Sequence, residues 1–298
     1  MPHARITRGS IDVVGRRRSY TLVAPPDVRP GGRLILVFPG SKQSGGTFRA
    51  LTGGSFDSLA TGAAAVVAYL DGYKGQWNDA CADSSVAARV EDVDDVAFAT
   101  AMVGALEGSH RIDRSKVYAA GFSSGGGMVI RLVHQVPGLL AGATVIAATQ
   151  PAPENFLLGA TPAVPIPMLL IHGTRDRLVP YDGGMIGGRM HRLARWMFHS
   201  GGLFLSAPQT AAYFAARNSI DQPPGSLNSV ESHAGSGTTS VTATDYRQAD
   251  RPPVTLYTVH GGGHTVPGPR HAPRVMGRTC ADLNTAEAIG EFFGLTRP

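Results

Sequence analysis

The sequence has little cysteine, few aromatic residues and no long apolar run. Its only cysteines, Cys81 and Cys280, are too few and too far apart for a zinc ribbon or a Cys-X-X-Cys redox pair. The sequence leaves open whether they form a disulfide or remain free thiols. No apolar run reaches the roughly 18 residues that a membrane-spanning helix needs, so we expect no membrane span.

Charge is also sparse, at 16% of residues, with a formal net charge of +5 carried mainly by scattered arginines. No basic stripe is interleaved with aromatic residues, so nucleic acid is not an expected partner. The first residues, 1–5, lead into polar sequence without the apolar core of an export signal. We therefore expect a cytoplasmic location if the chain is complete, and secretion stays open if a signal peptide was removed.

Glycine and proline are abundant instead, with 38 and 21 residues dispersed along the 298-residue chain. Short apolar runs alternate with longer helical patterns, which is typical of an α/β fold with a mostly parallel sheet. Folds of this class often reach this length as one unit, so we predict a single domain over residues 1–298. The predicted strands are Ser19–Ala24, Leu34–Phe38, Ala64–Leu70, Lys116–Ala120, Ala143–Ala147, Met168–His172 and Val254–Val259.

Apolar residues at helical spacing predict four helices, and two other segments break the alternation. Residues 183–206 are glycine-rich but carry several large apolar side chains, which fits either a lid over an active site or a helix docked on the surface. Residues 222–248 are polar and fit a surface connection or a β-hairpin. Acidic residues 91–95 favour the start of the first helix over a metal site. The predicted helices are Val90–Glu107, Ser124–Val136, Ala207–Asn218 and Asn284–Phe293.

The strongest local motif is Gly121-Phe122-Ser123-Ser124-Gly125. It follows the apolar run 117–120 and precedes an apolar helical stretch, which is the strand-then-helix context of a G-x-S-x-G nucleophile elbow. Its glycines leave room for a strained turn that lifts the serine hydroxyl off the sheet. The helix that follows directs its first amides toward an incoming oxyanion. The motif in this context predicts that Ser123 is a nucleophile.

A nucleophilic serine needs a base, and the base needs an orienting acid. Asp176 comes just after the predicted strand 168–172, at the edge of the sheet where sites of α/β folds are built. Asp182, six residues further on, is the competing acid, and its alternative role is to cap a turn before Gly183-Gly184. We predict Asp176 as the acid.

The base is sought among ten histidines. His264 follows the last predicted strand within the glycine run 261–263, which allows the imidazole to curl back over the sheet. His260 ends that strand itself, and His271 lies beyond two prolines. We predict His264 as the base, since an imidazole titrates near neutrality.

The oxyanion hole is predicted from two backbone amides. One belongs to Ser124, directly after the nucleophile, and the other to the loop 39–46 after an early strand. Within this loop the amide of Ser41 is the first candidate and that of Lys42 the second. An ordinary tight turn is the alternative interpretation.

Five segments, in this order, resemble the polyhydroxybutyrate depolymerase and carbohydrate esterase family 1 type of α/β hydrolase, which includes feruloyl and acetyl-xylan esterases. The resemblance implies an α/β-hydrolase fold, a mostly parallel central sheet with helices on both faces. It also implies a serine esterase that needs no metal or other cofactor. The segments are the oxyanion loop 39–44, the helix 93–98, the elbow 121–126, the acid loop 172–180 and the histidine loop 261–268.

The chain also departs from that family. Pro39 stands where the family has a histidine, and Ser41 where it has a cysteine. The segment Trp77-Asn78-Asp79 is similar to an aromatic substrate-site segment, which implies that Trp77 and Asn78 contact the substrate. A tryptophan packed in the core is the alternative.

Three functions remain in view from the sequence. The leading hypothesis is a carboxylic-ester hydrolase acting on small-molecule or oligomeric esters through an acyl-enzyme. The second is a serine peptidase of the same fold, and the third is a binding protein without activity. The oligomeric state and the natural ester are not predicted.

Overall fold

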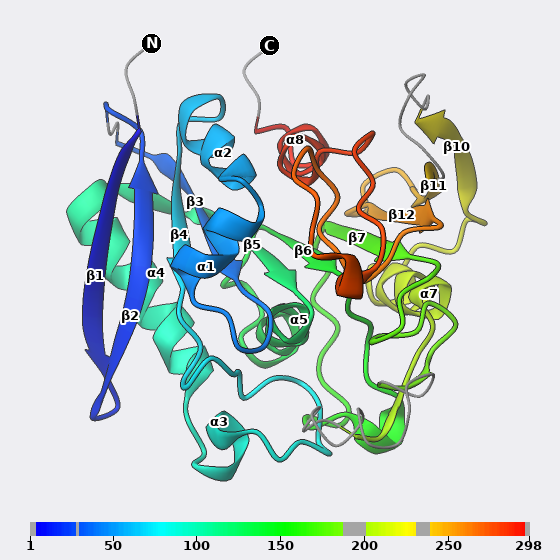
Figure 1. The fold of residues 1–298 in the computed structure, drawn as a ribbon, viewed down its shortest axis with the longest axis horizontal. Helices are drawn as coiled ribbons and strands as arrows, with labels where there is room; N and C mark the ends of the chain where they lie inside the picture. The colour runs from blue at the N-terminus through cyan, green and yellow to red at the C-terminus, as the bar shows by residue number, and fades with distance from the viewer. Residues whose placement is uncertain (1–3, 28–29, 187–200, 231–238, 296–298) are drawn as a thin grey trace.

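The structure is a computed structural model that describes residues 4–27, 30–186, 201–230 and 239–295. Its centre is a ten-stranded sheet in the order β1-β2-β4-β3-β5-β6-β7-β12-β11-β10 (Figure 1). The strands are β1 (Arg5–Val13), β2 (Arg16–Ala24), β3 (Gly32–Phe38), β4 (Ala65–Leu70), β5 (Ile112–Phe122), β6 (Gly142–Ile146), β7 (Met168–Gly173), β10 (Gly225–Val230), β11 (Ser240–Tyr246) and β12 (Val254–His260).

The six strands from β4 to β12 in this order run parallel, and the strands outside them are antiparallel. The structure thus confirms a mostly parallel central sheet, and it confirms all seven predicted strands within a few residues at their ends. A separate two-stranded pair joins β8 (Gly184–Met185) to β9 (Leu203–Phe204).

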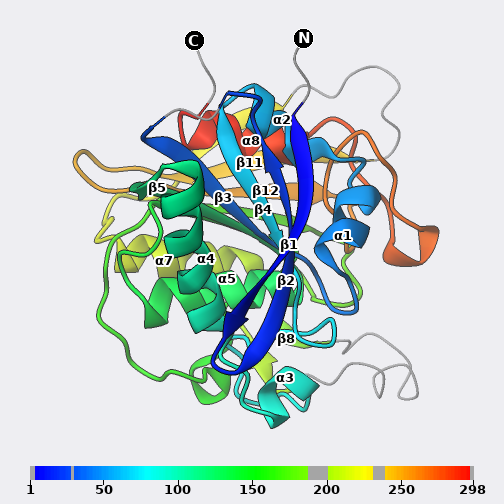
Figure 2. The same ribbon diagram turned by 90° about the vertical axis from the view of Figure 1, so that its left-hand side faces the viewer.

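Helices cover both faces of the sheet, as predicted. α4, α5 and α7 lie together on one side (Figure 2), while α1, α2 and α8 pack on the other. The helices are α1 (Gly45–Leu51), α2 (Ser58–Thr61), α3 (Ala87–Val90), α4 (Asp95–His110), α5 (Ser124–Gln135), α7 (Ala207–Arg217) and α8 (Thr285–Phe292), with 3-10 turns at Ser55–Asp57, Pro153–Asn155 and Arg274–Met276.

Strand β3 shows why the continuously apolar runs became central strands. Its side chains alternate between the faces, so Leu34 and Leu36 enter the core under α4 and α5, while Ile35 and Val37 enter the core under α1 and α8. All four are fully buried. A strand covered on both faces needs apolar residues at every position.

The first long helix begins later than predicted. α4 starts at Asp95 rather than Val90, because Asp92 adopts a positive φ of 44° and the side chain of Asp94 caps the amide of Ala97. The acidic residues do mark the helix start, as expected. Asp95 itself is buried and pairs with Arg18 of β2 at 2.6 Å.

The two segments that broke the alternation are described in part. Residues 222–248 contain β10 and β11, which pair antiparallel and extend the sheet, so the β-hairpin interpretation is correct for the described residues. In the segment 183–206 the structure describes only the ends. Residues 187–200, on which the choice between lid and surface helix depends, lie outside the described residues.

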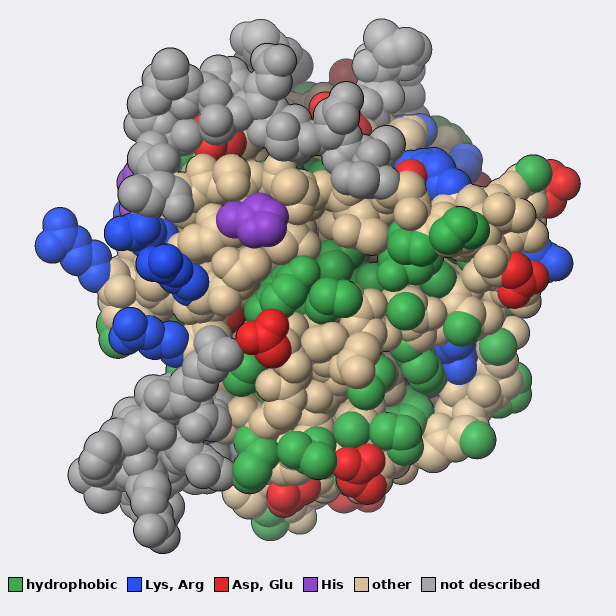
Figure 3. All heavy atoms as spheres, turned by 90° about the vertical axis from the view of Figure 1, so that its right-hand side faces the viewer, with side chains coloured by type: hydrophobic (Ala, Val, Ile, Leu, Met, Phe, Trp, Pro, Cys, Tyr) green, Lys and Arg blue, Asp and Glu red, His purple; other side chains and the backbone are tan. Residues whose placement is uncertain are grey.

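Three further observations bear on the sequence expectations. Cys81 and Cys280 are both buried free thiols, so they do not form a disulfide. In the described part of the chain, no helix has the length and apolar character needed to cross a bilayer. On the face shown in Figure 3, Lys and Arg side chains lie toward two sides, with hydrophobic groups spread across the middle.

Candidate active site

Ser123 occupies a strained turn between β5 and α5. Its φ of 55° and ψ of −123° belong to a region that side-chain-bearing residues rarely adopt. The turn brings neighbouring backbone very close. A Cβ on Gly121 would lie 2.2 Å from the Gly125 carbonyl oxygen, and a Cβ on Gly125 would lie 2.0 Å from that of Phe38. The glycines of the motif are therefore required by the packing of β5, α5 and β3.

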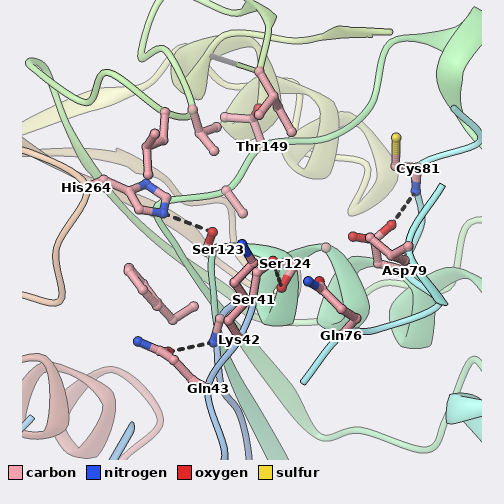
Figure 4. Close-up of a pocket in the computed structure, with 18 of the residues that line it drawn as sticks. Ser41, Lys42, Gln43, Gln76, Asp79, Cys81, Ser123, Ser124, Thr149 and His264 are labelled. Carbon is pink, nitrogen blue, oxygen red and sulfur yellow. Dashed lines mark hydrogen bonds between the residues drawn. The ribbon is translucent and has the colours of Figure 1, made fainter. Parts of the chain in front are cut away.

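Asp176, His264 and Ser123 form one chain of hydrogen bonds (Figure 4 shows the His264–Ser123 end). His264 Nδ1 lies 2.7 Å from Asp176 Oδ2, and His264 Nε2 lies 2.9 Å from Ser123 Oγ. Because a carboxylate can only accept, Nδ1 carries the proton, and Nε2 of the neutral ring accepts from the serine hydroxyl. The three residues follow β7, β12 and β5 at the carboxyl edge of the parallel strands.

The acid is held by the backbone of its own loop. Asp176 Oδ1 accepts from the amides of Leu178 and Val179 at 2.8 and 2.9 Å. Burial alone would raise the pKa of Asp176, but its interactions with His264, including their hydrogen bond, and with the nearby His172 outweigh burial and lower the pKa below its usual value. Asp176 is therefore an anion at neutral pH.

His172 lies beside this pair but outside the chain of hydrogen bonds. Its Nε2 is 3.6 Å from Asp176 Oδ2 and donates to the Val179 carbonyl at 2.9 Å. Burial lowers the pKa of His172, so the ring is neutral. No role was predicted for His172 from the sequence, and the available signal was its position at the start of the acid loop 172–180.

The loop after β3 lies against the start of α5. Ser41 Oγ and Ser124 Oγ are 3.0 Å apart, and both residues line the same pocket as Ser123. The amide of Lys42, the second candidate for the oxyanion hole, donates to the Gly75 carbonyl at 2.7 Å. That hydrogen bond occupies the Lys42 amide and leaves Ser41 as the stronger candidate from this loop.

The structure corrects the assignment of Trp77 and Asn78 to substrate contacts. Each is 1% exposed and lies outside the pocket lining. Trp77 Nε1 donates to the Pro39 carbonyl at 2.8 Å, and Asn78 Nδ2 donates to the Val93 carbonyl at 3.0 Å. A buried indole N–H needs an acceptor, and here the acceptor is the carbonyl of the first residue of the oxyanion loop.

The pocket at Ser123 has a volume of about 310 Å³. The neighbours of Trp77 and Asn78, rather than these two residues, contribute to it: Gln76 and Asp79 both face the pocket (Figure 4). Sequence reasoning located the segment but missed these two residues, because only tertiary contacts decide which side chains turn inward. Among the described residues, no three His, Cys, Asp or Glu side chains form a group that could hold a metal ion.

Comparisons with known proteins place the chain among esterases. Residues 77–192 match the family model described as Phospholipase/Carboxylesterase. The chain is 32% identical over 294 residues to "Putative esterase NocK" of Nocardia uniformis subsp. tsuyamanensis, covering 97% of this chain and 83% of that protein. It is 33% identical over 129 residues to feruloyl esterase B of Piromyces equi, covering 41% of this chain and 22% of that protein.

The fold is shared with a solved acetyl xylan esterase from Aspergillus awamori. That structure superimposes with a TM-score of 0.62 at 15% identity, covering 97% of this chain and 100% of that one. The match to NocK covers 97% of this chain at 32% identity, so it shows the family as well as the fold. The chain belongs to the esterases of the α/β-hydrolase family, among relatives that include feruloyl and acetyl-xylan esterases.

Proposed function

We propose that the chain hydrolyses carboxylic esters through a Ser123 acyl-enzyme, with His264 as general base and Asp176 as the acid that orients it. The observation that carries the proposal is the chain of two hydrogen bonds, 2.7 and 2.9 Å long, from Asp176 through His264 to Ser123. This arrangement activates a serine in acyl transfer, because the imidazole accepts the hydroxyl proton as the oxygen attacks.

The reaction proceeds in two halves. Ser123 Oγ attacks the ester carbonyl and its proton moves to His264 Nε2. The amides of Ser41 and Ser124 stabilise the resulting oxyanion. His264 then gives the proton to the departing alcohol, which leaves an acyl group on Ser123. Water, deprotonated by His264, releases the acid and restores the serine.

The substrates proposed are soluble esters of small acyl groups, either free or on an oligomer. The pocket volume of about 310 Å³ supports this size class. The relatives named as feruloyl and acetyl-xylan esterases make aromatic and acetyl esters on sugars the first to try.

A substrate panel with matched variants tests the proposal. Initial rates are measured with p-nitrophenyl esters of two to twelve carbons, methyl ferulate, acetylated xylan, hydroxybutyrate oligomers and an aminoacyl amide. Ser123→Ala is the test variant, and Ser115→Ala, an exposed serine on β5, is the control. A fluorophosphonate probe labels whichever serine is activated.

We expect Ser123→Ala to lose both ester hydrolysis and labelling while Ser115→Ala keeps them. Labelling that survives in Ser123→Ala would disprove the assignment of the nucleophile. Faster turnover of the aminoacyl amide than of every ester would show a peptidase instead. A folded wild-type protein inert to all substrates and to the probe would show a protein without this activity.

A further inference from the structure

The pocket continues past Ser123 on the side opposite His264. Figure 4 shows the side chains of Gln76 and Asp79 at this far end, facing the cavity. Both residues belong to the loop that follows β4, so they are separate from the loops that carry the acid and the base. We call Gln76 and Asp79 the polar end of the pocket. The reaction described above gives neither side chain a role.

Asp79 is a buried carboxylate with one oxygen open to the cavity. The residue is 8% exposed, and its Oδ1 accepts from the Cys81 amide at 3.0 Å. Among the described residues, no group donates a hydrogen bond to Oδ2, and this oxygen is not enclosed by protein. Within the same described residues, no Lys or Arg side chain lies within ion-pair distance of the carboxylate. The open oxygen therefore lacks a partner of its own.

Gln76 supplies a second open polar group beside the first. The residue is 9% exposed, and its side-chain amide has no hydrogen bond to a described protein group and is not enclosed by protein. Its backbone is fixed, since its amide donates to the Tyr73 carbonyl at 3.0 Å. Buried polar side chains are normally paired. Two unpaired ones that face a cavity from one segment can find their partner in the molecule that occupies the cavity.

Two arginines lie near Asp79 without neutralising it. Arg89 Nη2 donates to the backbone carbonyls of Asp79 and Cys81, and Arg131 Nη1 donates to that of Asn78. Neither arginine lines the pocket. Their hydrogen bonds are thus spent on the backbone of the loop, and the side of the carboxylate that faces the cavity meets no cation from them.

The polar end carries a negative charge at neutral pH. Burial is the main influence on Asp79 and raises its pKa to about 6, against the Cys81 amide and the charges of the two arginines. Burial also raises the pKa of the Cys81 thiol to about 12, so the thiol is neutral. Asp95, the other acid near Asp79, forms an ion pair with Arg18. Above pH 7 the unpaired charge that faces the cavity is therefore that of Asp79.

On the proposed mechanism, the polar end faces the acyl part of the ester. His264 must deliver a proton to the leaving alcohol, so the alcohol lies on the His264 side of the reacting carbon and the acyl group extends the other way. Asp79 Oδ2 lies against Gly127, where an added Cβ would come within 2.9 Å. Because Gly127 is four residues beyond Ser123 on α5, this oxygen is reached about 6 Å along the helix axis.

We propose that the polar end binds the primary ammonium group of an ester whose acyl chain ends in an amine. Asp79 Oδ2 accepts a hydrogen bond from one N–H of the ammonium, and the amide oxygen of Gln76 accepts another. An ammonium group has three donors and no acceptor, so it suits two acceptors of which one is charged. The proposal rests on the Ser123 acyl-enzyme proposed above.

Matched esters test it by kcat/KM at pH 8, where an aliphatic amine is protonated. Methyl 6-aminohexanoate is compared with methyl heptanoate, in which a methyl group replaces the ammonium, and with methyl 6-hydroxyhexanoate, which is polar but neutral. The pair 5-aminopentyl acetate and hexyl acetate places the same ammonium on the alcohol side. Asp79→Asn is the test variant, and Asp83→Asn, an exposed acid of the same loop outside the pocket lining, is the control.

For the wild type we expect methyl 6-aminohexanoate to exceed methyl heptanoate by about tenfold or more in kcat/KM, and the hydroxy ester to stay within about threefold of methyl heptanoate. Asp79→Asn should bring the amino ester's ratio to within about threefold, while Asp83→Asn keeps it.

A second measurement needs no variant. In the wild type the ratio should fall between pH 8 and pH 5, because Asp79 loses its charge as the pH drops through about 6. His264 acts on both esters alike, so its titration cancels in the ratio.

Other outcomes overturn the proposal. A wild-type ratio near one, or an equal gain for the hydroxy ester, would show that the polar end does not recognise a cation. A ratio that survives in folded Asp79→Asn, falls in Asp83→Asn or stays constant down to pH 5 would place the recognition elsewhere. A preference confined to the alcohol-side pair would contradict the acyl assignment. Failure of the acyl-enzyme is separate, since it would appear as hydrolysis of methyl heptanoate that persists in Ser123→Ala.

Discussion

Replacing Asp176 by Asn tests how residue 176 orients the base His264, because asparagine keeps the shape of the aspartate side chain. Asp176 Oδ1 accepts two backbone amides, so the asparagine oxygen is expected to take this place and turn its NH2 toward His264. His264 Nδ1 must then accept instead of donating, which moves the ring proton to Nε2. The imidazole in that tautomer donates to Ser123 and cannot take its proton. We expect kcat to fall by about 10⁴-fold, equivalent to about 5.5 kcal/mol of transition-state stabilisation.

The assay is steady-state hydrolysis of p-nitrophenyl acetate, with kcat and KM determined separately. KM should change little, because Asp176 is 1% exposed and lies outside the pocket lining. Asp182→Asn is the matched control, since Asp182 is the other acid of the same loop, and it should retain wild-type kcat. A folded Asp176→Asn variant with kcat within about tenfold of the wild type would refute the tautomer argument.

Three other changes probe the frame of the site. Trp77→Phe removes the hydrogen bond to the Pro39 carbonyl and should lower the unfolding free energy by about 1–3 kcal/mol with little change in KM. Urea unfolding and steady-state kinetics check this, and a raised KM at wild-type stability would contradict it. Arg18→Met leaves Asp95 buried without its counter-ion and should cost about 3–5 kcal/mol in urea unfolding; an unchanged midpoint would show that the pair is dispensable. Gly125→Ala should yield no folded enzyme by circular dichroism and activity, because the new methyl group overlaps backbone of β3, and a wild-type melting temperature would contradict this.

The central strands were predictable because burial on both faces imposes a simple pattern. Runs such as 34–38 contain no polar residue, and the structure places them in the middle of the sheet. β1 was not predicted, because it lies at the edge of the sheet and most of its residues are exposed or half-buried. An edge strand exposed in this way carries polar residues, so its sequence resembles that of a loop. For the same reason, the sequence of residues 222–248 left open whether they form a surface connection or the β-hairpin that contains β10 and β11.

The candidate site divides in a similar way. Ser123, Asp176 and His264 could be located from sequence because each follows a buried strand within a short glycine-containing motif. Their positions at strand ends imply that they meet, whereas the distances require the folded loops. Trp77 and Asp79 illustrate the limit. Both belong to one segment, and no local pattern says that the tryptophan turns into the core while the carboxylate turns into the pocket.

The folded loops hold that segment through its backbone more than through its side chains. The amide of Asn78 donates to Asp95 Oδ2 at 2.7 Å, and its carbonyl accepts from Arg131 Nη1 at 2.5 Å. Arg89 adds two further hydrogen bonds, to the carbonyls of Asp79 and Cys81. These charged groups are thus used to fix the wall of the pocket, which leaves the carboxylate of Asp79 without an ion pair in the described part of the chain. The arginines therefore hold the backbone beside Asp79 rather than its carboxylate, which stays buried at the wall of the pocket.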